Sequence, residues 1–272
     1  IDWHGSFDEY ANAKMKLLTQ TKVAVLNLND PEVILRGASW SGHKVFFGFD
    51  TPQAGEIGLV EELLIDRAFV SSPESAEVIA ELTDVKPAVP HNVSKAMAAA
   101  GLALAIGIAH PLVKSGIAKF ELDKHRLQTL LTKDGVTWVN DSKATNPHAA
   151  IAALQSQLES IWIAGGLAKG AAMDELARRS KGRIKAAILI GSDATTIQSA
   201  LLKESPNLAI YMTDSNLTGI DVMAQVMGIV KNIAVSGDVV LLAPACASMD
   251  QFKNYADRGD IFTQAAKGAF GE

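Results

Sequence analysis

Residues 136–165 read VTWVNDSKATNPHAAIAALQSQLESIWIAG and decide the fold. The mostly apolar runs at 136–140 and 161–165 predict two buried strands. Asn146, followed directly by a proline, is a favourable N-cap, so a helix is expected over 147–155. A strand, a helix and a second strand in this order are typical of parallel strands joined by a helical crossover.

The same alternation continues toward the C-terminus and predicts a parallel sheet with helices on both faces. Further strands are expected at 186–190, 208–212 and 239–243, and further helices at 173–180, 194–203, 220–233 and from Met249 onward. Near-continuous apolar strands that alternate with helices are typical of this α/β architecture. Ligands of such folds collect at the carboxyl ends of the strands. The polar residues after each strand are therefore the first candidates for a functional site.

The chain before residue 122 follows a less regular pattern. A helix is expected at 8–19, strands at 22–27 and 44–49, a loop at 83–92 and a helix rich in small residues at 96–113. The pattern changes at 121–124, which predicts a domain boundary there. Two domains agree with a length of 272 residues, since a domain usually holds about 100–200.

Composition excludes several classes of protein. The formal net charge of −5 gives no electrostatic reason to expect binding to nucleic acid or to a membrane surface. The single cysteine, Cys246, excludes an internal disulfide framework, and a reducing cytoplasm is expected. The six histidines include no pair with the close spacing of metal ligands.

Two features of the first half bear on membranes and on completeness. The 18 residues at 96–113 carry no formal charge, which approaches the length of a membrane-spanning helix. Their many Ala and Gly residues, the pair His110-Pro111 and the lysines on both sides favour a buried helix instead. The chain begins with Ile1 rather than Met and has no signal-peptide pattern, so a processed protein or a fragment of a longer one is expected.

The loop after the strand at 136–140 contains Asp141, Lys143 and Thr145. These residues would lie beside the free N–H groups at a helix start, a place that favours anions. The lysine can hold a phosphate, the threonine can bond a carboxylate, and the aspartate can bond a ribose hydroxyl or a metal-bound water. An ordinary polar loop with a helix cap is the alternative, and spacing alone does not separate the two.

The loops after two other strands supply further candidates. Gly165 and Gly166 would permit close backbone approach, with Lys169 at the same sheet edge, although a flexible loop with a solvated lysine explains the pattern equally. The phosphate-binding spacing G-x-x-x-x-G-K-[ST] is absent. Ser248 is expected to cap a helix start that could receive a carboxylate. Cys246 is expected to be a small buried residue rather than a nucleophile.

Three residues are weak candidates by themselves. Arg126, close to the predicted boundary, could reach a phosphate. Asn92, before the small-residue helix, could read the edge of a base or merely cap the helix. Lys14 lies within a predicted helix, where lysines are usually solvated, and only a crowded metal site would give it another role.

The motifs taken together resemble the Mur ligases, and within that family the members that add D-glutamate. The segments that carry the resemblance are DWHGSF (2–7) with Tyr10 and Lys14, HNV (91–93), HR (125–126), NDSKATN (140–146), GG (165–166) with Lys169, and PACASMDQFKNY (244–255). They span nearly the whole chain in the family's order. NDSKATN and PACAS-x-DQF are specific to the D-glutamate-adding members.

The resemblance implies an ATP- and Mg²⁺-dependent ligase of three domains. Residues 1–122 would be the C-terminal part of the central ATPase domain and 123–272 the whole C-terminal Rossmann-like domain, with the phosphate-binding loop upstream of Ile1. The substrates would be UDP-N-acetylmuramoyl-L-alanine and D-glutamate, joined through an acyl phosphate in peptidoglycan synthesis. A cytoplasmic monomer is expected, and the 272-residue chain by itself is expected to be inactive.

The resemblance also implies roles for single residues. Lys14 matches a lysine whose carbamylation supplies an oxygen ligand to Mg²⁺, and Asn92 matches an adenine contact. Arg126 and Asp141 match residues around the ATP phosphates and ribose. The positions around D-glutamate and the reacting carboxyl group are Lys143, Thr145, Lys169, Ser248, Met249 (through its backbone) and Tyr255, of which Lys143 and Lys169 are expected to be catalytic together with Lys14.

The sequence departs from the family's pattern at a few positions outside the D-glutamate loops. Gln128 stands two residues after Arg126, where an acidic residue is usual, and Lys95 stands where a second Asn is usual after His91-Asn92. A non-catalytic module that binds a small acidic ligand or a nucleotide is the alternative function. A dinucleotide-dependent redox enzyme is disfavoured because no G-x-G-x-x-G follows the first regular strand.

Overall fold

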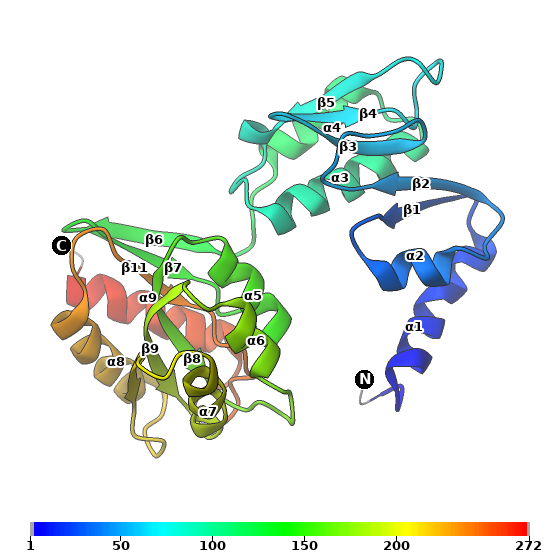
Figure 1. The fold of residues 1–272 in the computed structure, drawn as a ribbon. Coiled ribbons are helices and arrows are strands. Elements are labelled where there is room, and N and C mark those ends of the chain that lie inside the picture. The colour runs from blue at the N-terminus through cyan, green and yellow to red at the C-terminus, as the bar shows by residue number, and fades with distance from the viewer. Residues whose placement is uncertain (1–2, 271–272) are drawn as a thin grey trace. The chain divides into compact units, whose positions relative to one another are not determined.

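A computed structural model describes residues 3–270, which form two compact units (Figure 1). The first unit ends at Glu121 and the second begins at Leu122. Ile1 and Asp2, where the motif DWHGSF begins, lie outside the described residues. Each unit has its own sheet and its own hydrophobic core, so each can be understood from its own residues.

The first unit is built on a five-stranded sheet in the order β1-β2-β3-β4-β5. The first three strands are parallel, and the last two continue the sheet antiparallel. The strands are β1 (Val23–Asn27), β2 (His43–Phe47), β3 (Glu56–Val60), β4 (Leu63–Asp66) and β5 (Glu77–Glu81). The helices are α1 (Phe7–Met15), which continues as the 3₁₀ segment η1 (Lys16–Gln20), α2 (Pro31–Gly37), the 3₁₀ turn η2 (Leu82–Asp84), α3 (Pro90–Ala105) and α4 (His110–Lys119). Ile57, Ile79 and Met97 are fully buried, so the sheet and α3 share one core.

The stretch rich in small residues forms two helices, so the prediction of a single helix at 96–113 was wrong. α3 begins at Pro90, inside the predicted loop at 83–92. Gly107, with φ of 85°, takes the left-handed conformation that ends many helices. Pro111 then stands in the first turn of α4, where the missing N–H of proline costs no hydrogen bond. Within residues 3–270, no helix has the length and apolar character needed to cross a membrane.

The second unit contains a six-stranded sheet in the order β10-β9-β8-β11-β7-β6. All its strands are parallel except β6, which pairs antiparallel with β7. The strands are β6 (Gln128–Lys133), β7 (Val136–Asn140), β8 (Ser160–Gly165), β9 (Ile184–Ile190), β10 (Ala209–Met212) and β11 (Val239–Leu242). The helices are α5 (Pro147–Gln155), α6 (Asp174–Arg179), α7 (Ala194–Glu204), α8 (Gly219–Ile233) and α9 (Tyr255–Phe270). The predicted α/β fold with a parallel sheet is confirmed, and β7 and α5 have the predicted bounds.

Helices cover both faces of this sheet (Figure 1). On one face, Ile161 and Ile163 of β8 belong to the same core as Val226 of α8 and Phe262 of α9. Every residue of β8 is buried, which requires cover on the other face as well. This explains why the strand is continuously apolar in sequence instead of alternating.

The sequence prediction missed β6. Asp134 and Gly135 form the two-residue connection between β6 and β7, with φ of 53° and 77°. Positive φ at both positions is typical of a type I′ hairpin turn, for which Asp-Gly is a favoured pair. The Asp-Gly pair directly before the strand at 136–140 was therefore the available signal.

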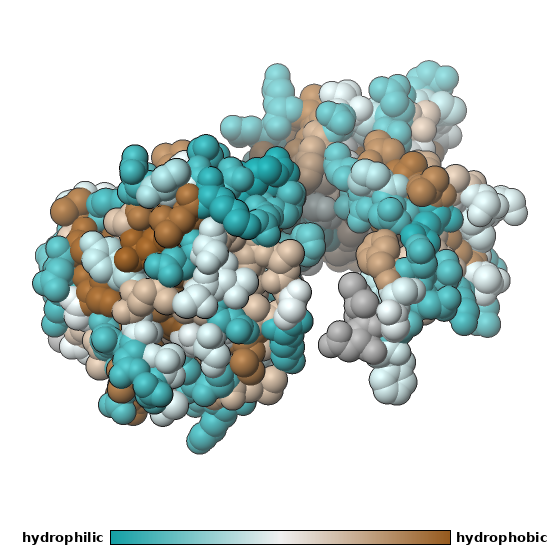
Figure 2. Space-filling view, turned by 60° about the horizontal axis from the view of Figure 1, so that its bottom comes forward, coloured by the Kyte–Doolittle hydropathy of each residue, from teal (hydrophilic) through white to brown (hydrophobic). Residues whose placement is uncertain are grey.

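Hydrophobic side chains on the visible surface lie in groups among hydrophilic ones (Figure 2). The most exposed large apolar side chains include Leu158 and Ile220 in the second unit and Leu35 and Ile106 in the first. More than half of a typical protein surface is apolar, so exposed residues of this kind do not by themselves mark a site.

Candidate functional site

The loop that follows β7 forms the first part of the site. Asn146 caps α5 through its side-chain oxygen, which fixes the end of the loop. The start of the loop is anchored to β11, because the Asp141 N–H donates to the carbonyl at the end of that strand at 2.8 Å. Asp141, Lys143 and Thr145 therefore lie between two fixed points at the carboxyl edge of the sheet.

The segment around Arg126 lies along this loop. The Lys143 N–H donates to the His125 carbonyl at 3.1 Å, and the Leu127 N–H donates to Asp141 Oδ1 at 3.1 Å. His125 and Leu127 have φ of 65° and 44°, left-handed conformations that are unfavourable for residues with a side chain. The hydrogen bonds hold both residues in place. Arg126, Asp141 and Lys143 thus form one group, which we name the Lys143 cluster.

The Lys143 side chain lies over an aromatic ring of α9. Its Nζ is 3.8 Å from the centroid of the Tyr255 ring, which is a cation–π contact. Tyr255 is the first residue of α9, and its carbonyl accepts a hydrogen bond from Ser142 Oγ at 2.7 Å. The ring and the loop are therefore fixed to each other, and the structure brings Tyr255 together with the cluster.

Backbone hydrogen bonds join the loops that follow β8 and β11. Leu167 and Ala247 exchange two such bonds of 2.9 and 3.0 Å. Gly165 and Gly166 have φ of 122° and 125°, and a Cβ on either residue would overlap a neighbouring carbonyl oxygen. Only glycine allows this close approach. Lys169, three residues further on, is exposed at the same edge of the sheet.

Ser248 does not cap a helix, so that prediction was wrong. Its carbonyl accepts two backbone N–H groups, at 3.2 and 2.9 Å, which closes a tight turn. The carbonyl of Gln251 accepts a backbone N–H at 2.9 Å and its side chain donates to the Leu217 carbonyl at 2.7 Å, so the turn does not extend into a helix. α9 begins only at Tyr255, capped by the side chain of Asn254.

The two candidates in this turn differ in exposure. Ser248 is buried, with 3% of its surface exposed, whereas 58% of Met249 is exposed. A ligand at this edge would reach Met249 before it reached the hydroxyl of Ser248.

Arg258 holds the three loops together, although the sequence did not predict it as a site residue. The side chain is fully buried. Its guanidinium donates to Ser142 Oγ at 3.1 Å and to the Ser142 carbonyl at 3.0 Å, both in the β7 loop. It also donates to the carbonyls of Cys246 at 3.2 Å and of Gly165 at 3.4 Å, in the β11 and β8 loops. Burial lowers the pKa of Arg258 to about 10, so the side chain is still a cation at neutral pH.

Cys246 is a structural residue, as the sequence predicted. Its exposed fraction is 1%, and burial raises the pKa of its thiol to about 12. A nucleophilic cysteine needs a thiolate near neutral pH. The thiol is therefore not the reactive group of the site, and the backbone carbonyl of Cys246 accepts from Arg258.

Lys14 and Asn92 belong to the first unit. Lys14 is exposed on α1, with Nζ 5.4 Å from the centroid of the Tyr10 ring. Asn92 is buried in the first turn of α3 and donates to the Pro87 carbonyl at 3.2 Å. Asn92 therefore stabilises the start of its own helix. Burial lowers the pKa of the preceding residue, His91, to about 4.

The described residues do not by themselves form a site for Mg²⁺. Across residues 3–270, no group of three His, Cys, Asp or Glu side chains is arranged to hold a metal ion. Lys14 ends in an ammonium group, which is not a metal ligand, and only its carbamate would offer oxygen.

Residues 125–246 match the family model described as "Mur ligase, glutamate ligase domain". This chain carries a Mur ligase C-terminal domain. The matched range begins at His125 and ends at Cys246, so the Mur ligase domain includes the whole Lys143 cluster and the β8 loop with Lys169.

A curated relative resembles the whole chain. The UDP-N-acetylmuramoylalanine–D-glutamate ligase of Thermobifida fusca (strain YX) is 42% identical over 275 residues, which cover 100% of this chain and 59% of that protein. The chain therefore spans somewhat more than half the length of the curated relatives it matches.

Solved structures share the fold. The pseudomurein peptide ligase type C of Methanothermus fervidus has a TM-score of 0.68 at 15% identity, covering 95% of this chain and 59% of that one. A MurF ligase of Thermotoga maritima in complex with ADP has a TM-score of 0.61 at 15% identity, covering 98% of this chain and 58% of that one. At such identities the likeness extends to the Mur ligase fold alone.

Proposed function

We propose that the protein is an ATP-dependent amide ligase that joins D-glutamate to UDP-N-acetylmuramoyl-L-alanine. The observation that carries this proposal is the edge of the sheet, where Lys143 and Lys169 lie on loops that backbone hydrogen bonds and Arg258 tie together. A dicarboxylate amino acid and a nucleotide phosphate are the anions that such an edge suits. The name of the relative at 42% identity supports the same reaction.

The reaction requires activation of a carboxylate. A carboxylate does not acylate an amine at neutral pH, because the leaving group would be an oxide. ATP supplies a phosphoryl group, which converts the alanyl carboxylate into an acyl phosphate and leaves ADP. The amine of D-glutamate then forms the new C–N bond, the C–O bond to phosphate breaks, and the amine proton leaves to solvent or a base.

The Lys143 cluster provides the charges for the phosphoryl step. Lys143 neutralises negative charge on the transferred group, and its contact with the Tyr255 ring limits the positions that its ammonium can take. Arg126 binds phosphate oxygens of the nucleotide, and Asp141 bonds a ribose hydroxyl. The hydrogen bonds between these two segments support a joint role, because they keep the three side chains on one rigid piece of backbone.

The other candidates bind D-glutamate. Its two carboxylates need donors at fixed separation, and the backbone bridge between the β8 and β11 loops provides that rigidity. Donors fixed at three or more points distinguish D-glutamate from its mirror image, because the amine of L-glutamate would point away from the acyl phosphate. The residues proposed for this role are Thr145, Lys169, Ser248, Met249 through its backbone N–H, and Tyr255.

The remaining expectations concern the first unit and the cellular setting. We propose that Lys14 is carbamylated and ligates Mg²⁺, which when bound would shield the ATP phosphates, and that Asn92 contacts the adenine. We further propose a monomeric cytoplasmic enzyme of peptidoglycan synthesis, with neither a nucleic acid nor a membrane as partner. Cell-wall growth and division would depend on its product.

Phosphate release by the full-length enzyme tests the proposal. Release should require ATP, UDP-N-acetylmuramoyl-L-alanine and D-glutamate together, and omission of any one should abolish it. The 272-residue chain alone should release none. Equal rates with L-glutamate or meso-diaminopimelate in place of D-glutamate would contradict the assignment of the amino acid.

A further inference from the structure

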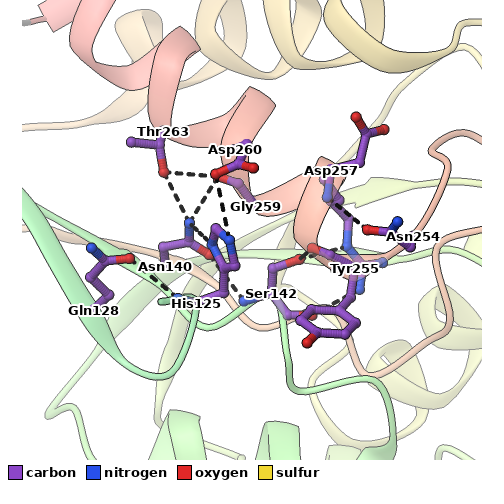
Figure 3. A network of polar contacts seen from close by, with 11 residues as sticks. His125, Gln128, Asn140, Ser142, Asn254, Tyr255, Asp257, Gly259, Asp260 and Thr263 are labelled. Atoms are coloured by element: carbon purple, nitrogen blue, oxygen red, sulfur yellow. Dashed lines mark hydrogen bonds and ion pairs between the residues drawn. The ribbon is translucent and has the colours of Figure 1, made fainter. Parts of the chain in front are cut away.

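The side chain of Asn140 lies at the end of β7 and is fully buried in the polar network of Figure 3. Its Oδ1 accepts the Ser142 N–H at 3.0 Å, and its Nδ2 lies 2.9 Å from the Gly259 carbonyl. A backbone N–H can only donate and a carbonyl can only accept. The orientation of the amide is therefore fixed, with Nδ2 facing α9.

This orientation decides which nitrogen of His125 carries the proton. Nδ2 of Asn140 also lies 3.1 Å from His125 Nδ1. The two hydrogens of the amide nitrogen are shared among His125 Nδ1, the Gly259 carbonyl and Thr263 Oγ1. Because an amide nitrogen cannot accept a hydrogen bond, Nδ1 is the acceptor in this contact and carries no proton. The proton of the neutral ring is then on Nε2, which faces Asp260 Oδ1 at 3.5 Å. Thr263 Oγ1, 3.0 Å from Nδ2, donates in turn to the Gly259 carbonyl at 2.8 Å.

Two charged groups act on the His125 ring, Asp260 from α9 and Lys124 from the same segment as the histidine. Burial has a larger effect than either charge and holds the pKa of His125 below its ordinary value of 6.5. The ring is therefore neutral at pH 7, as the hydrogen bond from Asn140 requires.

His125 is also part of the backbone that supports the site. A Cβ on Gly259 would overlap the His125 ring, so the ring and α9 are in close contact. The His125 carbonyl accepts the Lys143 N–H at 3.1 Å. Asn140 therefore reaches the loop of Lys143 by two routes, one through the Ser142 N–H and one through His125.

We infer that Asn140 is a positioning residue for the ligase reaction: it holds His125 as the neutral Nε2–H tautomer and thereby fixes the Lys143 cluster. Its effect on catalysis rests on the proposed function, whereas its effect on the tautomer does not. Asn140 itself is buried and acts through Lys143.

The test is the variant Asn140→Asp with ¹⁵N-labelled histidine, measured by NMR. The carboxylate keeps the acceptor for the Ser142 N–H but removes the donor to His125, so His125 should gain a proton on Nδ1 and its pKa should rise. The unchanged protein should show a neutral Nε2–H ring at pH 7. Thr263→Val is the matched control, since it removes another acceptor of the same amide and should leave the pKa of His125 unchanged. An Nδ1–H ring in the unchanged protein, or no rise in Asn140→Asp, would overturn the inference.

The pH profile of kcat for phosphate release gives the second readout. Asn140→Asp should lower kcat about tenfold at pH 8 and should recover part of it as the pH falls and His125 of the variant takes up a second ring proton. Thr263→Val should show no such dependence. A loss in Asn140→Asp that is uniform with pH would identify Asn140 as a purely structural residue and contradict the inference. If the unchanged enzyme releases no phosphate with these substrates, the proposed function fails while the NMR result stands.

A second pair of variants covers the case in which Asn140→Asp does not fold. His125→Asn keeps an acceptor beside the amide and tolerates the positive φ, so kcat should fall by no more than about threefold. His125→Leu removes the acceptor and should lose about tenfold. Equal losses in the two variants would contradict the role of the hydrogen bond.

Discussion

The substitution Arg258→Met should destabilise the second unit by about 3 kcal/mol. Methionine is apolar and can occupy much of the same space, so the main loss is of hydrogen bonds. The guanidinium donates to four acceptors, which are Ser142 Oγ and the carbonyls of Ser142, Gly165 and Cys246. A buried acceptor without a partner costs about 1–3 kcal/mol, and the removal of a buried cation offsets part of the sum.

Urea unfolding followed by tryptophan fluorescence measures this loss. Trp138 and Trp162 are fully buried in the second unit, so the emission reports on that unit in a background in which Trp3 and Trp40 of the first unit are replaced by Phe. Arg258→Lys keeps the charge but has a single donating nitrogen, and should cost about half as much. A loss below about 1 kcal/mol for Arg258→Met, with an unchanged dependence on urea, would refute the view that Arg258 ties the loops together.

Three further predictions concern other parts of the chain. Lys143→Ala should lower kcat for phosphate release at least about a hundredfold without changing the urea midpoint, because it removes a charge that acts in the transition state; an unchanged kcat would count against the cluster. Gly166→Ala should cost about 2 kcal/mol or more of unfolding free energy, because its Cβ would overlap the Ala247 carbonyl. Gly170→Ala is the control and should cost less, because its Cβ would have no neighbouring atom within 4 Å. The pKa of His91 is about 4 in the folded protein, below its ordinary 6.5, so folding stability should be lost as the pH falls from about 6.5 to 4. His91→Gln should remove part of that loss in thermal unfolding, and an unchanged pH slope would contradict the burial argument.

The parts of the fold that local signals control could be predicted from the sequence. The strand at 136–140 and the helix at 147–155 have the predicted bounds because apolar periodicity and an N-cap mark them. The break near Gly107 was missed because the small residues around it gave a helical pattern that masked the glycine. β6 was missed although its Asp-Gly turn was visible.

The parts that depend on long-range contacts could not be predicted. Arg258 bonds to Ser142 across 116 residues, and no local pattern reveals such a partner. The turn at Ser248 resembles a helix start in sequence, but contacts of Gln251 with residues 217 and 219 end it. The candidate residues on the β7 and β8 loops were found because parallel strands bring their carboxyl ends to one edge, a rule that needs only the strand order.

Isotope transfer in the full-length enzyme tests the central claim most directly. UDP-N-acetylmuramoyl-L-alanine would be labelled with ¹⁸O in its alanyl carboxylate and incubated with ATP and D-glutamate, and the phosphate analysed by mass spectrometry. The account predicts one ¹⁸O atom in each phosphate released, together with an amide of D-glutamate as product. Unlabelled phosphate would contradict it, because the carboxylate oxygen would then never have been bonded to phosphorus.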